Sequence, residues 1–159
     1  MNPLDQLHEE LTRTYSSVFV AYHRAHIAHI NIRSRTFYSD HKLLQKIYEF
    51  LQDTVDTVGE KIQSCGLGGV PTSIADTMAL SSVEDLPVEG SADELLHTVW
   101  EDLNTLIDVY HDLTTAAREV NYPDVDNMAA DHIGRIATFA WKIEDTLDLE
   151  GRHTRRAPI

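Results

Sequence analysis

Four side chains with metal-binding chemistry lie at defined spacings between residues 29 and 60. His41 follows His29 after twelve residues. Asp56 follows His41 after fifteen residues, and Glu60 comes four residues later. Two imidazoles and two carboxylates combine ring nitrogen with hard oxygen, a ligand set that suits a first-row transition metal. The segment therefore predicts a metal site whose geometry depends on the helices that carry it.

The two histidines and the two carboxylates cannot reach one metal ion within a single chain. Apolar residues recur at steps of three and four from Leu44 to Ile62, which predicts a helix over residues 37–64. At 1.5 Å per residue, Asp56 would lie about 22 Å along that helix from His41. The helical period also places Asp56 and Glu60 on a different side of the helix from the apolar stripe, so we expect them to face outward.

Two copies of this helix, packed antiparallel about a two-fold axis, would bring the ligands together. His41 of one copy would then meet Asp56 and Glu60 of the other. His29 could join them, because a short connection ties it to the start of the helix. Such a contact is isologous and creates two identical sites per dimer. The alternative is that Asp56 and Glu60 belong to an ordinary solvated face.

Three further long helices are predicted around this one. An apolar stripe that starts at Leu4, and that His26 and His29 continue, indicates a first helix over about residues 3–31 with both histidines pointing inward. His26 is equally compatible with a hydrogen-bonded place in the core. The capping box that begins at Ser91 indicates a helix ending near residue 121. Pro123 separates it from a last helix over roughly 125–149.

The connections between these helices indicate the architecture. Residues 31–36 join the first two helices, with Ser34 or Thr36 able to cap the second. A crossover of about 26 residues follows the second helix and contains short TSIADTMALSS and VEDL segments, which could form a turn or two of helix. One long crossover lets two helices of a bundle run parallel, the ferritin-like arrangement. The predicted fold is therefore all-α, with a ferritin-like four-helix bundle over residues 1–150 and a basic, flexible tail over 151–159 that Gly151 begins.

Composition limits the remaining possibilities. The chain has 159 residues, of which 42% are hydrophobic and 25% charged, as in a soluble single domain. It has no apolar run of membrane-spanning length, no signal-peptide pattern and one cysteine, Cys65. These absences favour a cytoplasmic protein without membrane contact. A formal net charge of −13 is typical of a solubilising surface, and it also attracts cations and repels nucleic acid.

The segment HINIRSRTFYSDH resembles the signature of the Dps proteins, the mini-ferritins named as DNA-binding proteins from starved cells. In that family two histidines, an aspartate and a glutamate at the spacings found here form a ferroxidase centre between subunits. The segments TMALSSVED and FAWKIEDTL resemble the short crossover helix and the last helix of the family, with Trp141 at the place of an expected tryptophan. The resemblance covers roughly residues 4–149.

This resemblance implies a homododecamer built from two-fold dimers. It would bind Fe(II), oxidise it preferentially with hydrogen peroxide, and store the ferric mineral in its hollow interior. His29, His41, Asp56 and Glu60 would be both the catalytic residues and the iron ligands. Acidic residues near the start of the last helix line the family's three-fold pores, which makes Asp126 and Asp131 the candidate iron-entry residues. For the neighbouring Asp124 and for Asp126, helix capping is the competing interpretation.

The chain departs from the family pattern at three positions in or just after the segment HINIRSRTFYSDH. Ile30 stands where the family usually has tryptophan, Ser34 replaces a common glycine, and Gln45 stands where some members carry an acidic residue. The substitution by Ile30 removes an aromatic neighbour of the site without changing the four ligands.

Two other functions remain open at this stage. The first is DNA compaction with iron chemistry as a secondary role, for which Arg152, Arg155 and Arg156 in the tail offer the cations. The net charge of −13 opposes this function. The second is an inert structural shell. An ordinary ferritin site would need Glu-x-x-His pairs on two helices, whereas the pairs at Glu94 and Asp108 both lie on the predicted third helix.

Overall fold

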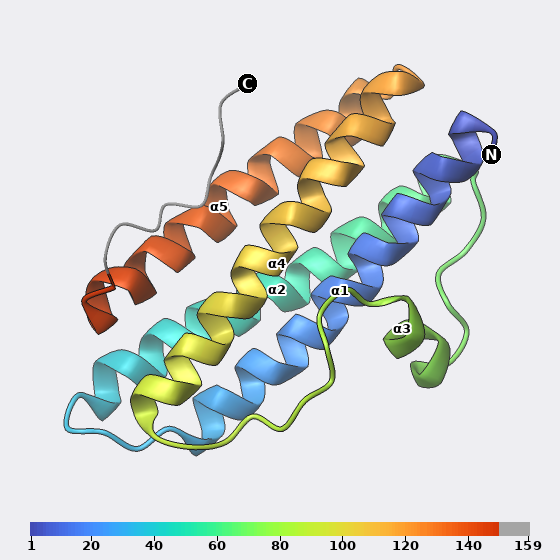
Figure 1. Cartoon of the computed structure of the whole chain (residues 1–159). Coiled ribbons are helices and arrows are strands. Elements are labelled where there is room, and N and C mark those ends of the chain that lie inside the picture. Colours follow the sequence, from blue (N-terminus) through green and yellow to red (C-terminus); the bar gives the residue numbers. More distant parts are fainter. Residues whose placement is uncertain (150–159) are drawn as a thin grey trace.

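The computed structural model describes residues 1–149 and shows an antiparallel bundle of four long helices with a short helix beside it (Figure 1). The helices are α1 (Pro3–Asn31), α2 (Phe37–Ser64), α3 (Ile74–Leu80), α4 (Ala92–Glu119) and α5 (Pro123–Leu147). Helices α2 and α4 run in one direction, and α1 and α5 run in the other. The long crossover between α2 and α4 makes this topology possible, which confirms the predicted all-α bundle.

The ends of the helices follow local capping chemistry. Ser91 and Glu94 form the predicted capping box at the start of α4. Helix α5 begins at Pro123, two residues earlier than predicted, because a proline needs no hydrogen-bond acceptor at the first helical position. It ends at Leu147, where Asp148 adopts a left-handed conformation with φ 54°. The predicted stop at Gly151 and the tail over 151–159 lie outside the described residues.

The core lies between the apolar stripes of the long helices. Helix α1 packs against α2 and α4, and α4 packs against α5. The largest fully buried side chains are mostly leucines and isoleucines from these stripes: Leu7, Leu11, Leu44, Ile47, Leu51, Leu103 and Leu106. Leu4 was predicted to belong to the inward stripe but is exposed at the first turn of α1. No helix within residues 1–149 combines the length and the apolar character that crossing a membrane requires.

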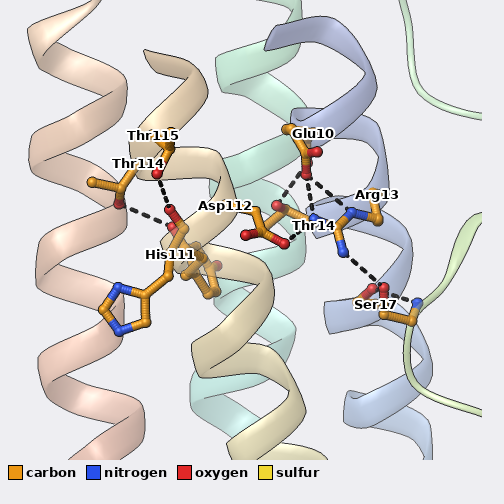
Figure 2. Close-up of polar contacts among 10 residues, drawn as sticks. Glu10, Arg13, Thr14, Ser17, His111, Asp112, Thr114 and Thr115 are labelled. Carbon is orange, nitrogen blue, oxygen red and sulfur yellow. Dashed lines mark hydrogen bonds and ion pairs between the residues drawn. The ribbon is translucent and has the colours of Figure 1, made fainter. Parts of the chain in front are cut away.

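Polar contacts fix the crossover against α1. Figure 2 shows Arg13 of α1 reaching Asp112 of α4, with a separation of 2.7 Å between Nη2 and Oδ2. Arg13 also donates to the hydroxyl of Ser82, whose backbone N–H donates to the hydroxyl of Ser17. Helix α3 accounts for the helical part of the crossover, while the predicted VEDL turn is non-helical and is anchored by buried Val83.

A buried ion pair makes a second attachment of the crossover. Arg24 of α1 donates from Nε to Oδ2 of Asp102 on α4 at 2.7 Å. The same guanidinium donates from Nη1 to the carbonyl oxygen of Leu86 in the crossover. Burial raises the pKa of Asp102 to about 6, although Arg24 acts in the opposite direction. The ion pair that holds this part of the crossover is thus largely removed from water.

Candidate metal centre

His29 and His41 form a reciprocal pair at the junction of α1 and α2. The Nδ1 atom of His29 lies 2.9 Å from the carbonyl oxygen of His41, and Nδ1 of His41 lies 2.9 Å from the carbonyl oxygen of His29. The two rings are stacked, with centroids 3.7 Å apart and planes inclined by 19°. The short 32–36 connection therefore brings together two histidines that are twelve residues apart in the chain.

These two hydrogen bonds determine which ring nitrogen is available to a metal. A carbonyl oxygen can only accept, so each Nδ1 must carry a proton and donate it. In a neutral imidazole the other nitrogen, Nε2, then holds the lone pair. Donation of the second ring N–H to a backbone carbonyl is the usual way in which proteins orient a metal-binding histidine. In the neutral rings, both Nε2 atoms are thus able to act as ligands.

Burial favours the neutral form of the His29 ring. The side chain is only 6% exposed. Burial lowers the pKa of His29 below its ordinary value, and this effect outweighs the hydrogen bond to the His41 carbonyl, which acts to raise it. A neutral ring has a free lone pair without having to release a proton first.

Aromatic rings surround the pair. Tyr48 of α2 meets His29 edge to face with centroids 4.9 Å apart, and it meets His26 in the same way at 4.9 Å. Phe37 also stacks on His41, with ring centroids 4.9 Å apart. His26 is half-buried among these rings, so it occupies a packing position and not a surface position. The rings restrict the orientations of both candidate ligands.

Asp56 and Glu60 lie on the exposed face of α2, as the helical period predicts. They line a hollow with a volume of about 690 Å³, whose other walls include Tyr15, Val55 and Val70. Within residues 1–149 no three histidine, cysteine, aspartate or glutamate side chains converge tightly enough to hold a metal ion. The described part of the chain thus separates a histidine pair from a carboxylate pair.

Candidate entry residue Asp126 and the neighbouring Asp124 are engaged in ion pairs within the chain. Asp126 accepts from Arg118 Nε at 2.9 Å, and Asp124 accepts from Lys61 Nζ at 3.1 Å. The contact with Lys61 holds the pKa of Asp124 below its ordinary value. Asp131 is exposed and is in no ion pair found within residues 1–149. The three carboxylates are therefore not equivalent, and Asp131 is the one without a cationic neighbour bound to it.

Sequence reasoning missed Asp40, the residue that precedes His41. Its side chain is only 5% exposed. Ser34 and Thr36 were expected to cap α2, but Thr36 makes no capping hydrogen bond with its side chain. Both hydroxyls instead donate to Oδ2 of Asp40, at 2.7 and 2.8 Å. The pattern of two hydroxyls followed by an aspartate was the only signal for this arrangement.

Sequence reasoning also missed a group of exposed cations near the junction of α1 and α2. Arg33 and Arg35 lie in the connection, and Lys42 and Lys46 lie in the first turns of α2. None of the ion pairs found within residues 1–149 involves any of them. We call these four residues the cationic corner. It is unusual in a chain with a net charge of −13.

Comparisons with known proteins agree with this fold. The family described as Ferritin-like domain matches residues 5–152. A protein named DNA protection during starvation protein from Brevibacillus brevis is 25% identical over 143 residues, covering 87% of this chain and 92% of its own length. A protein of the same name from Helicobacter pylori is 22% identical over 137 residues, covering 86% of this chain and 94% of its own length.

Solved structures show the same fold. Antigen TpF1 from Treponema pallidum superposes with a TM-score of 0.85 at 24% identity, over 92% of this chain and 94% of that protein. Dps from Listeria monocytogenes superposes with a TM-score of 0.84 at 19% identity, over 89% of this chain and 93% of that protein. The ferritin-like architecture predicted from the helix pattern is confirmed.

Proposed function

We propose that this chain, which belongs to the ferritin-like family and to its Dps branch, oxidises Fe(II) and stores the ferric product. The reaction would take place between two subunits of a homododecamer built from two-fold dimers. One subunit would contribute His29 and His41, and the other would contribute Asp56 and Glu60. Hydrogen peroxide is the preferred oxidant in this proposal, and iron is the substrate and not a resident cofactor.

The observation that carries the proposal is the paired orientation of His29 and His41. Both Nδ1 atoms donate to backbone carbonyls, which leaves the two Nε2 atoms of the stacked rings close together. Because the Nδ1 donor of each ring is satisfied in this way, neither Nε2 atom is needed to hold the rings in place.

The surface around the two half-sites fits an antiparallel contact between copies. Near the histidines, Ile30 and Phe37 are exposed large apolar side chains, at 61% and 45%. Near the carboxylates, Tyr15, Val55 and Val70 provide a partly apolar hollow. A two-fold contact along α2 would cover the first group with the second and would remove both from water.

The donor set suits the oxidation of Fe(II). Asp56 and Glu60 bring negative charge, which favours Fe(III) over Fe(II) and lowers the reduction potential of bound iron. His29 and His41 hold the ion without adding charge. Two Fe(II) ions supply the two electrons that one hydrogen peroxide needs to become two hydroxide ions. Delivering both electrons to one peroxide avoids release of hydroxyl radical. Separately, Asp131 could attract incoming Fe(II).

Complementation between two inactive variants tests the shared site. We expect His41→Ala and Asp56→Ala each to lose peroxide-driven Fe(II) oxidation. Subunits of the two variants are then unfolded, mixed and assembled together. In a mixed dimer, the histidines of the Asp56→Ala subunit face the intact carboxylates of the His41→Ala subunit. One of the two sites is complete, so we expect activity to return only in the mixture.

The matched control is a mixture of His41→Ala with His29→Ala. Both variants damage the histidine half, so every dimer lacks a complete site and the mixture should stay inactive. Recovery in the control, or none in the first mixture, would show that the four residues do not form a shared site. The single variants must assemble like the parent, which sedimentation checks.

DNA protection is the second candidate function. The curated relatives from Brevibacillus brevis and Helicobacter pylori bear that function in their names. The cationic corner offers four exposed cations for phosphate, in addition to Arg152, Arg155 and Arg156, which lie outside the described residues. Many copies on one particle would act together. The net charge of −13 per chain opposes such binding.

A gel-retardation assay at low salt separates the two sources of cations. Retardation that disappears on removal of residues 151–159 would assign DNA binding to the tail. Retardation that persists in this variant and disappears in Arg33→Ala/Arg35→Ala would assign it to the cationic corner. Absence of retardation by the intact assembly at low salt would exclude DNA protection through direct contact.

A further inference from the structure

We infer that Asp40 is a positioning residue for the iron site, because its carboxylate fixes the α1–α2 connection and thereby the orientation of His41. This inference rests on the proposed function, since it concerns how one of the proposed ligands is held. Asp40 would not touch iron. It would act through the backbone of the connection and of the first turn of α2.

The hydrogen bonds of Asp40 join the second half of the connection to the first turn of α2. Its Oδ2 atom accepts from the hydroxyls of Ser34 at 2.7 Å and Thr36 at 2.8 Å. Its backbone N–H donates to the carbonyl oxygen of Thr36 at 3.0 Å. The N–H of Phe37 donates to the carbonyl oxygen of Ser34 at 3.2 Å. One carboxylate oxygen therefore ties both hydroxyls of the connection to the first turn of the helix.

The burial of Asp40 indicates a geometric role. An aspartate in the first turn of a helix is favourable at the surface, where it interacts with the helix dipole. That benefit does not require burial, and taking a carboxylate out of water is costly unless hydrogen bonds replace the water. Asp40 is only 5% exposed, and two hydroxyl donors converge on one of its oxygens. An exposed acid such as Asp5 of α1 supplies the dipole interaction alone.

The connection between Asp40 and the ligands is short. His41 follows Asp40 directly, and its ring and its carbonyl oxygen both bond to His29. Each of these bonds requires the last turn of α1 and the first turn of α2 to keep their separation. The carbonyl of His29 belongs to the last turn of α1, where it has no acceptor role within the helix. Loosening the 32–36 connection would therefore break both hydrogen bonds. The rings could then rotate, and either nitrogen could carry the proton.

Anaerobic Co(II) titration of the assembled protein tests this role without any oxidation. Co(II) is bound by the same classes of ligand as Fe(II), and its visible absorption reports the coordination. The variants are Asp40→Ala, Asp40→Asn and the double variant Ser34→Ala/Thr36→Ala. Asp5→Ala is the matched control, because it removes a first-turn aspartate that is exposed. Spectra of ¹⁵N-labelled histidine in the assembled protein report the protonated nitrogen of each ring.

We expect Asp40→Ala to weaken Co(II) binding by about 10- to 100-fold, the usual effect of removing a group that orients a metal ligand. The double variant should behave in the same way, because it removes the two donors and keeps the carboxylate. Asp40→Asn should stay close to the parent, since its amide oxygen can accept both hydroxyl donors. The signal of Nδ1-protonated histidine should decrease in Asp40→Ala and in the double variant, but not in Asp40→Asn.

Several results would overturn the inference. One is an Asp40→Ala variant that binds Co(II) as tightly as Asp5→Ala. Another is an Asp40→Asn variant that loses as much affinity as Asp40→Ala, which would assign the effect to charge. A third is weaker binding with unchanged histidine tautomers. If Asp40→Ala fails to assemble, the double variant and Asp40→Asn carry the comparison.

A parallel titration of His41→Ala separates this inference from the proposed function. If His41→Ala loses Co(II) binding and Asp40→Ala does not, only the positioning role is wrong. If His41→Ala binds Co(II) as the parent does, the proposed iron site itself is wrong.

Discussion

His132 and Tyr110 show how single buried polar residues are satisfied in this bundle. The hydroxyl of Tyr110 and Nδ1 of His132 lie 2.9 Å apart between α4 and α5. Tyr110 is fully buried, and His132 is nearly so. Burial lowers the pKa of His132 below its ordinary value, although the nearby Asp131 acts to raise it. His132 is therefore neutral in the folded protein at neutral pH.

The lowered pKa of His132 predicts a specific pH dependence of folding. A histidine whose pKa is lower in the folded than in the unfolded state contributes stability that is fully present above the unfolded pKa, about 6.5. That contribution is lost as the pH falls through the folded value. We expect the free energy of unfolding of the parent to fall relative to His132→Asn as the pH decreases from neutrality. Urea unfolding of both proteins over a pH series measures this difference.

The same comparison can also contradict this prediction. Asparagine cannot titrate but can still accept from the hydroxyl of Tyr110. Global effects of acid act on both proteins and cancel in the difference. A difference that stays constant with pH would show that the pKa of His132 is the same in the folded and unfolded states.

Residue types and spacings predicted the candidate ligands, but not how they are held. The twelve-residue interval between His29 and His41 is visible in the sequence. Their mutual hydrogen bonds are not, because each uses a backbone carbonyl whose direction depends on the fold. Asp40 has the appearance of an ordinary first-turn acid, and only its burial shows otherwise.

At the scale of whole elements, the crossover depends on a few polar attachments. Arg24 binds both Asp102 on α4 and the carbonyl oxygen of Leu86. We expect Arg24→Leu to lower the free energy of unfolding by about 3–5 kcal/mol, because it leaves the carboxylate of Asp102 buried without a partner. Thermal or urea unfolding measures this change, and hydrogen exchange in residues 81–90 should increase.

The double variant Arg24→Leu/Asp102→Leu distinguishes the ion pair from the packing around it. Replacing both charges with apolar side chains removes the unpaired carboxylate, so we expect part of the lost stability to return. Equal losses in the single and double variants would mean that the contact with Leu86, and not the unpaired charge, determines the cost.

Local signals predicted the elements better than their ends. The capping box at Ser91 placed the start of α4 correctly, because both of its hydrogen bonds are formed between residues close in sequence. The end of α5 was placed two residues too late, because Asp148, a non-glycine residue, takes a left-handed conformation that ends the helix at Leu147. The non-helical VEDL segment follows from tertiary anchoring of Val83, which local propensity does not contain.

At the scale of the whole molecule, the proposed chemistry depends on assembly. The separation of about 22 Å along α2 between the two half-sites follows from helix geometry alone. The sequence could therefore predict that one chain would carry only half of each proposed site. It could not predict the hollow around Asp56 and Glu60, because Tyr15 of α1 and Val70 of the crossover complete its walls.

Filling this hollow should disrupt assembly and iron oxidation together. Gln52 is exposed and lines the hollow one helical turn before Asp56. We expect Gln52→Arg to place a cation beside Asp56 and to obstruct an approaching subunit. The chain itself should fold normally, since a surface substitution usually changes stability by less than about 0.5 kcal/mol. Sedimentation measures assembly, and peroxide-driven Fe(II) oxidation measures activity.

Thr57→Arg is the matched control for this prediction. It adds the same charge to an exposed position of α2 that does not line the hollow. We expect it to assemble and to oxidise iron as the parent does. If Gln52→Arg instead remained monomeric and oxidised Fe(II) at the parental rate, a single chain would suffice for the chemistry. The two pairs are too far apart along α2 to bind one ion within a single chain. This result would therefore contradict the shared site.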